Sequence, residues 1–123
     1  MAKAAGKVAE DLFKYALGFP GAWEDHPWGE QVAKVGKKVF LFFGKGDGGG
    51  CGFSVKLPTS GPDALSLPFA TPTGYGLGKA GWVSFDFPST AKLPVDAARG
   101  WIEESYRAVA PKKLVAQLDK AGR

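Results

Sequence analysis

The stretch EQVAKVGKKVFLFFG, residues 30–44, decides the fold, because two apolar segments flank a short turn. The letters EQVAKV predict a strand, and the Gly-Lys-Lys that follows predicts a tight turn. Alternation in the second strand, VFLFFG, would place on one face Val39, Leu41 and Phe43. Phe40 and Phe42 would lie on the other face. A strand that is apolar on both faces is typical of a sheet interior, so we expect this strand to be central.

The strand pattern continues toward the C-terminus. The glycine-rich run GKGDGGGCG, residues 44–52, predicts a hairpin loop, and FSVKL at residues 53–57 alternates cleanly. A last strand, WVSFDF at residues 82–87, would bury Val83, Phe85 and Phe87. The run between them, ATPTGYGLGKAG, is interpreted as a loop. The hairpins follow one another without crossover helices, which indicates an antiparallel sheet.

Helical spacing appears at both ends of the chain. Apolar residues recur at intervals of three and four before Gly18 and Pro20, which end the first helix. GPDALSLPF has room for a turn or two of helix, Pro94 opens a longer helix, and Pro111 starts a short terminal one. The inward stripe of the longer helix comprises Ala98, Trp101, Ile102, Ser105 and Val109. We predict an α+β fold, residues 1–123, in which helices pack on one face of an antiparallel β-sheet.

Composition limits the class of protein. At 123 residues the chain is one domain by length, and 18 glycines with nine prolines indicate many turns. The net charge of +4 makes a polyanionic partner plausible. The single cysteine, Cys51, excludes an internal disulfide and a cysteine-based zinc site within one chain. No stretch has the length and apolar character of a membrane span or a secretory leader, so we expect a cytoplasmic protein without a membrane partner.

One face of the predicted sheet carries an aromatic ring beside a cation. If Val55 and Phe85 point toward the helices, then Ser54, Lys56, Trp82 and Ser84 point away from them, on an otherwise uncovered face. Trp82 could pack beneath the loop TPTGYGLG with Tyr75 beside it. Alternatively, Trp82 and Lys56 could form a platform for an anionic ligand or nucleic acid.

Catalytic constellations are weak in this sequence. His26 is the only histidine, and pairing it with Cys51 would place a nucleophile on a glycine-rich loop that holds it poorly. Glu24, Asp25 and His26 are successive, and successive residues rarely point at one metal ion. The G-x-G-x-x-G matches that begin at Gly44 and Gly76 lead into strands, whereas the dinucleotide fingerprint leads into a helix. We therefore expect no enzymatic activity, no cofactor and no metal requirement.

Several blocks of the sequence point to a known family. FPGAWEDHPWG, KVGKKVF, SVKLP, PTGYGLGKAGWVSF and WIEESYRAVAPKKL occur in this order between about Phe19 and Leu118. In these blocks the chain resembles the MmcQ/YjbR family of small bacterial proteins. The resemblance implies a CyaY-like (double-wing) α+β fold and a predicted DNA-binding role, without a residue-level mechanism. Two departures are the glycine-rich GDGGG loop and a tryptophan in DHPWG where many members have phenylalanine.

The same resemblance raises a competing function. Frataxins share the CyaY-like fold and bind iron through an acidic first helix and the adjoining strand, although a fold alone does not transfer an activity. The first helix here carries Glu10 and Asp11 against three lysines, which makes a poor cation trap. The resemblance thus favours a polyanion over iron.

If nucleic acid binds, basic residues at hairpin tips and at the last helix junction are the candidate contacts. The nucleic-acid-binding candidates are Lys34, Lys37, Lys38, Lys45, Lys56, Lys79, Trp82, Arg107, Lys112 and Lys113. The family's wings would be hairpins, which favours the first four lysines as phosphate contacts. DNA or another polyanion is the expected partner of a protein that acts as a monomer. A small-ligand or protein-interaction adaptor is the alternative, and a frataxin-like metal binder is a third.

The stretch FPGAWEDHPWG itself is interpreted mainly as a structural corner. Pro20 and Gly21 would stop the first helix, and Trp23 and Trp28 could bury large apolar areas against the sheet. The carboxylates of Glu24 and Asp25 could accept hydrogen bonds from backbone donors at the turn. A ligand site in the carboxylate–histidine cluster remains the second interpretation.

Overall fold

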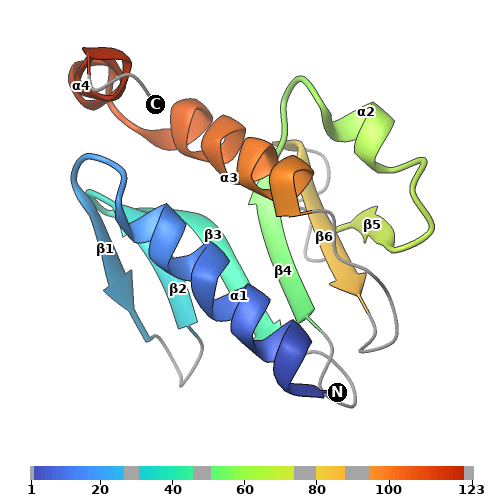
Figure 1. The fold of residues 1–123 in the computed structure, drawn as a ribbon. Helices are drawn as coiled ribbons and strands as arrows, with labels where there is room; N and C mark the ends of the chain where they lie inside the picture. Colours follow the sequence, from blue (N-terminus) through green and yellow to red (C-terminus); the bar gives the residue numbers. More distant parts are fainter. Residues whose placement is uncertain (1, 27–30, 46–50, 74–79, 88–94, 121–123) are drawn as a thin grey trace.

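The computed structural model describes residues 2–26, 31–45, 51–73, 80–87 and 95–120, which contain both helices and strands (Figure 1). In chain order these are α1 (Ala2–Leu17), β1 (Ala22–Asp25), β2 (Gln31–Val35), β3 (Lys38–Lys45), β4 (Cys51–Lys56), α2 (Gly61–Ala64), β5 (Ala70–Pro72), β6 (Trp82–Phe87), α3 (Val95–Val109) and α4 (Lys112–Lys120). Within this part of the chain, no helix is long and apolar enough to cross a bilayer.

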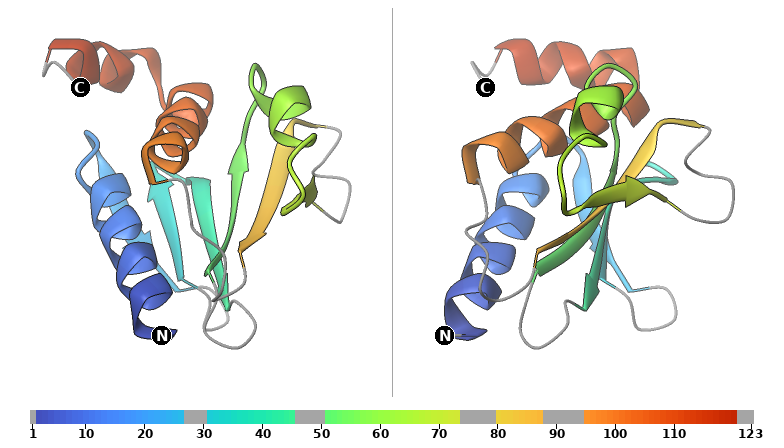
Figure 2. Two further views of the ribbon diagram at one scale, coloured as in Figure 1. Left: turned by 45° about the vertical axis from the view of Figure 1, so that its right-hand side comes forward. Right: turned by 90° about the vertical axis from the view of Figure 1, so that its right-hand side faces the viewer.

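The strands form one open, antiparallel sheet in the order β1-β2-β3-β4-β6-β5. Helices α1 and α3 pack on one face, here called the inner face, and the opposite face is called the outer face (Figure 2). The predicted α+β architecture is confirmed, as is the interior position of β3. The consecutive strands β1 to β4 pair with their sequence neighbours. Local alternation predicted β2, β3 and β4, whereas β1 was not predicted, because its residues were interpreted as a structural corner.

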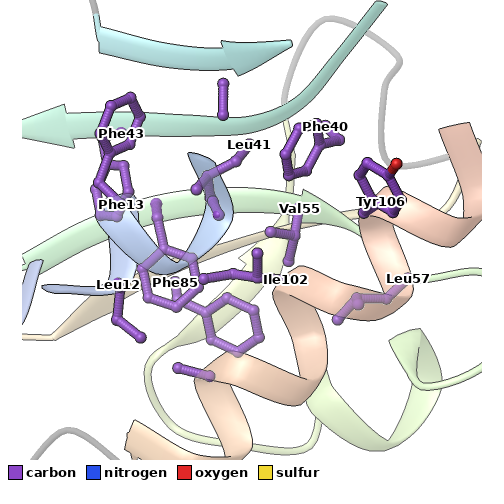
Figure 3. Close-up of a cluster of buried hydrophobic side chains, with 14 of the residues drawn as sticks. Leu12, Phe13, Phe40, Leu41, Phe43, Val55, Leu57, Phe85, Ile102 and Tyr106 are labelled. Atoms are coloured by element: carbon purple, nitrogen blue, oxygen red, sulfur yellow. The ribbon is translucent and has the colours of Figure 1, made fainter. Parts of the chain in front are cut away.

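The hydrophobic core lies between the inner face and the two long helices (Figure 3). Aromatic rings fill much of it. Phe13 of α1 meets Phe43 edge to face, with ring centroids 5.4 Å apart, and Phe85 stacks on Trp101 of α3 at 4.2 Å. Because these contacts join α1 to β3 and α3 to β6, the core fixes both helices on the sheet. Complete burial of one such side chain contributes about 1.5–3 kcal/mol.

The predicted alternation of β3 is wrong at one position. Lys34 of β2 pairs with Val39, and Ala33, the residue before Lys34, pairs with Leu41. Phe40 is therefore an extra residue in β3. This β-bulge turns Phe40 and Leu41 both toward the inner face, where each is completely buried. Phe42 therefore shares the outer face with Val39 instead of opposing it.

The corner between α1 and β1 is held by the C-terminal helices. The Tyr106 hydroxyl of α3 donates a hydrogen bond to the Pro20 carbonyl oxygen at 2.5 Å. Gly21 has a φ of 71°, and a Cβ atom there would lie 2.8 Å from Leu114 of α4. Glycine is therefore favoured at this position by its backbone conformation, and a larger residue would also require the Leu114 side chain to move.

Two other sequence-based boundaries change. Lys45 pairs with Cys51, so the β3 and β4 strands extend into the run that was predicted to be loop, and only residues 46–50 separate them. The segment predicted as loop after Phe69 begins with a short strand, β5, which pairs with β6 at the edge of the sheet. Pro72 lacks an N–H donor, which is tolerated in an edge strand and explains why the strand signal was weak.

Candidate functional site

A hollow of about 340 Å³ opens where β3 begins, β4 ends and β6 begins. We call it the basic hollow. Its lining consists of Lys38, Val39, Phe42, Lys56, Trp82 and Val109. Phe42 and Trp82 meet edge to face with ring centroids 5.4 Å apart. The hollow therefore combines two amines with an aromatic and aliphatic wall.

Strand register explains why Lys56 and Trp82 lie together. They are direct partners across β4 and β6, so their side chains share the outer face, as predicted. The prediction of an otherwise uncovered face is wrong at its centre, because Trp82 is 8% exposed and Val32 is completely buried. Trp82 therefore presents little of its ring to solvent, whereas Phe42 is half-buried.

The bulge in β3 contributes the apolar wall. With Phe40 as the extra residue, Val39 and Phe42 both face outward beside Trp82. The pairing of β3 with β4 ends at Leu41 and Val55, so Phe40 and Lys56 do not pair directly.

A buried serine of α3 bridges this gap in the sheet. The Ser105 hydroxyl accepts a hydrogen bond from the Lys56 N–H at 2.9 Å and donates one to the Phe40 carbonyl oxygen at 2.5 Å. It thus fixes the backbone of Lys56 at the mouth of the hollow. The sequence placed Ser105 on the inward stripe of α3 but did not assign it this role; a hydroxyl within an apolar stripe was the available signal.

The segment after β4 is held by a carboxylate of the same helix. Glu104 accepts hydrogen bonds from the Thr59 N–H, the Ser60 N–H and the Ser60 hydroxyl at 2.8, 2.9 and 2.6 Å. The pKa of Glu104 lies below its ordinary value. Partial burial is the largest single influence and acts to raise the pKa, but the three hydrogen bonds together outweigh it. No pattern in the sequence predicted this interaction.

Three further lysines accompany the hollow at the same end of the molecule. Lys37 lies at the tip of the β2–β3 hairpin next to Lys38, and both are exposed. Lys112 and Lys113 are exposed at the start of α4, three and four residues after Val109. Figures 1 and 2 place α4 at the end of the sheet where β2 and β4 finish. We call the set Lys37, Lys38, Lys56, Lys112 and Lys113 the basic end.

The amines of the basic end are not neutralised by the described acids. Among residues that the structure describes, no carboxylate lies within 4.0 Å of any of these five amines. The hairpin tip is also fixed in place, because the Trp23 indole N–H donates to the Gly36 carbonyl oxygen at 3.0 Å. The basic end therefore presents uncompensated positive charge on an ordered scaffold.

Two other candidate cations are engaged by acids. The Lys34 amine lies 3.2 Å from Asp25 and 5.0 Å from the centre of the Trp23 ring. The pKa of Asp25 is lowered, mainly by the hydrogen bond from the His26 N–H and then by Lys34. Arg107 contacts Glu103 at 2.9 Å and Asp119 at 2.8 Å. These contacts raise the pKa of Arg107, Asp119 having the largest effect.

Of the remaining candidates, Lys45 and Lys79, the structure describes only the backbone of Lys45. Lys45 closes β3, seven residue steps of about 3.3 Å from Lys38, so its backbone lies roughly 23 Å away. The Lys45 side chain and all of Lys79 lie outside the described residues, as do Trp28 and Tyr75. Their predicted roles therefore stay predictions.

The three side chains of the carboxylate–histidine cluster, Glu24, Asp25 and His26, do not converge on one site but make separate contacts. Glu24 and His26 lie on one face of the strand with their side chains 2.6 Å apart, and Asp25 lies on the other face beside Lys34. In the described ranges no group of three His, Cys, Asp or Glu residues is arranged to hold a metal ion. Asp25 does accept the backbone hydrogen bond predicted at this corner. The predicted burial of Trp23 is wrong, since its ring is 44% exposed on an edge strand.

The other half of the outer face is polar. The Ser84 hydroxyl lies 2.7 Å from that of Ser54 and 2.9 Å from that of Thr73, forming a row of hydrogen-bonded hydroxyl groups across β4 and β6. A second hollow, of about 250 Å³, lies on the α2 side of Trp82. Its lining is apolar and comprises Leu57, Pro58, Gly61, Pro62, Leu65, Gly81, Trp82 and Val83.

Comparison with known proteins adds one finding. The sequence model of the YjbR family matches residues 17–108, which is more than half of the chain and includes every described strand and all of α3 except its last residue. No curated protein matches the chain. Of the residues that line the basic hollow, all but Val109 fall within the matched range.

Proposed function

The chain belongs to the YjbR family, and on this premise we propose that it is a non-enzymatic, cytoplasmic nucleic-acid-binding protein whose basic end contacts backbone phosphates. The observation that carries the proposal is the pairing of two amines, Lys38 and Lys56, with an aromatic wall in a hollow that has no acidic residue in its lining. Positive charge with aromatic surface is the combination that nucleic-acid grooves use.

Charge placement supports phosphate contact more than base readout. Exposed lysines on the hairpin tip and at the start of α4 can approach a backbone from two elements. Neutralised phosphates release counterions, so the logarithm of the binding constant falls with that of the salt concentration, by about 0.9 per phosphate on duplex DNA. None of these contacts requires a particular base sequence.

A pair of charge-matched variants tests the proposal. Lys37→Gln/Lys38→Gln removes two charges at the basic end, and Lys14→Gln/Lys120→Gln removes two exposed charges from α1 and the far end of α4. In a fluorescence-anisotropy titration with DNA, the first variant should weaken binding and lower the salt slope by about 1.8 on duplex. The second should resemble wild type. Equal effects of both variants, or no binding by wild type at low salt, would refute the proposal.

The second hollow supports a different candidate function. Its apolar lining between α2 and Trp82, next to the exposed side chains of Leu65 and Leu67, suits a small uncharged ligand or an apolar side chain of a partner protein. An adaptor of this kind would bind without dependence on salt. The DNA titration at two salt concentrations therefore separates the two functions.

A further inference from the structure

We propose that the basic hollow receives one unpaired nucleotide, so that the protein prefers single-stranded nucleic acid to duplex. This inference rests on the proposed function and specifies its ligand. The shared chemistry is a phosphate joined through a sugar to an exposed nucleobase, which a strand or a free nucleotide can supply.

The lining of the hollow matches the two parts of a nucleotide. Lys38 and Lys56 come from different strands and both line the hollow, so their amines supply the positive charge that a phosphate requires. Val39 and the half-buried Phe42, beside the largely buried Trp82, offer apolar surface to the face of a base. A carboxylate in the lining would repel the phosphate, and none is present there.

The same lining predicts little base specificity. Apart from the two lysines, the side chains around the basic hollow carry no hydrogen-bonding group except the Trp82 indole N–H. Base edges are read by matched donors and acceptors, whereas apolar and aromatic surfaces contact any base face. We therefore expect binding that tolerates changes of sequence.

The size of the hollow favours a single nucleotide. Its volume of about 340 Å³ lies at the small end of the roughly 300–1,000 Å³ typical of ligand sites. In a duplex the base faces are stacked and paired, so a base reaches such a wall only after it leaves the stack, at a cost of a few kcal/mol. A single strand presents its bases without that cost.

The position of the hollow lets neighbouring phosphates reach other amines. Lys37 adjoins Lys38 at the hairpin tip, and α4 begins with Lys112 and Lys113 shortly after Val109. A strand whose one base enters the hollow can thus place flanking phosphates near the basic end. The apolar hollow on the other side of Trp82 lacks any charged lining residue, so it does not suit a nucleotide.

The test compares a labelled single strand of about 12 nucleotides, the same strand in a duplex, and a deoxynucleotide 5′-monophosphate as competitor. Two variants alter the hollow. Phe42→Leu removes the ring but keeps an apolar side chain, and Lys56→Gln removes one amine while the backbone contact to Ser105 remains. Lys120→Gln is the charge-matched control, and thermal unfolding of each variant verifies that it folds.

We expect wild type to bind the single strand at least tenfold more tightly than the duplex. Loss of base contact in Phe42→Leu should weaken single-strand binding about fivefold or more and leave duplex binding within twofold. Lys56→Gln should lower the single-strand salt slope by about 0.7. The mononucleotide should compete only at concentrations well above that of the strand.

The outcomes distinguish this inference from the proposed function. Equal affinity for duplex and single strand, or equal weakening of both by Phe42→Leu, would overturn the inference while nucleic-acid binding stands. A mononucleotide that binds as tightly as the strand would assign the hollow to free nucleotides and overturn the preference for strands. If neither form of DNA binds at low salt, the proposed function fails and the inference fails with it.

Discussion

Replacement of Ser105 by alanine tests whether the Ser105 hydroxyl stabilises the fold where the pairing of β3 with β4 ends, beside the basic hollow. The Ser105 side chain is completely buried, and its hydroxyl connects two backbone groups of different strands, the Lys56 N–H and the Phe40 carbonyl. In an unbroken antiparallel ladder the pair after Leu41 and Val55 would be Phe40 and Lys56. The hydroxyl takes the place of that missing pair.

The cost of the substitution follows from the two groups left without a partner. A buried donor or acceptor without a hydrogen bond costs about 1–3 kcal/mol, so two cost about 2–6 kcal/mol. Alanine differs from serine by one oxygen atom, and the cavity contribution is therefore small. The two strands can close part of the gap by relaxation, so we expect Ser105→Ala to lower the free energy of unfolding by about 2–4 kcal/mol.

Urea denaturation measures this free energy by linear extrapolation. Ser66→Ala is the matched control, because the Ser66 hydroxyl also donates to a backbone carbonyl, that of Asp63, but is exposed; its cost should stay within about 0.5 kcal/mol. The slope of unfolding free energy against urea should be the same for wild type and both variants. A cost below about 1 kcal/mol for Ser105→Ala would show that the bridge across the sheet is not needed.

Two other predictions concern side chains of α3. The lowered pKa of Glu104 means that its ionised form stabilises the fold above the ordinary value of 4.5, and this contribution is lost as the pH falls through the lower folded pKa. Glu104→Gln should therefore be less stable than wild type by about 1 kcal/mol at pH 7, with a difference that shrinks below pH 4.5 in urea titrations; a difference independent of pH would contradict it. Tyr106→Phe removes the hydroxyl that donates to the Pro20 carbonyl and should lower the free energy of unfolding by about 1–2 kcal/mol. Burial raises the pKa of Tyr106 above its ordinary value of 10.0. Ultraviolet titration of wild type should therefore show a tyrosine that ionises above pH 10.0, and the variant should lack it. Unchanged stability together with an unchanged titration would refute that role.

Local patterning was sufficient for most of the fold. The alternation in residues 53–57 predicted which side chains of β4 face the helices, and the helical spacing before Gly18 predicted α1. These patterns succeed because strand and helix periods are fixed by backbone geometry and one face of each element must be buried. β5 was missed because a strand of three residues with a proline has almost no period to detect.

Interactions that depend on the register of paired strands could not be predicted from the sequence. Lys34 and Asp25 are nine residues apart, and only the pairing of β1 with β2 brings the carboxylate beside the amine. The exposure of Trp23 has a similar origin. β1 is an edge strand, so Trp23 has a neighbouring strand on one side only. Charge counting therefore predicted a basic surface but not which cations are neutralised.

The candidate site illustrates the same limit more sharply. Alternation correctly placed Lys56 and Trp82 on one face, because β4 and β6 are regular. It failed in β3, where the extra residue Phe40 changes the face of every residue on one side of the bulge. Nothing in the sequence marks the extra residue, because the run from Val39 to Phe43 is apolar at every position.

The bulge links the fold to the proposed ligand. With strict alternation, Val39 and Phe42 would lie on opposite faces, and the wall of the hollow could not form. The extra residue places both of them outward, ends the β3–β4 ladder one pair early, and leaves the gap that Ser105 bridges. An irregularity that is held by a buried hydroxyl and that lies directly beside two lysines is more readily explained by a binding role than by stability, since a regular ladder would satisfy the same backbone groups without help.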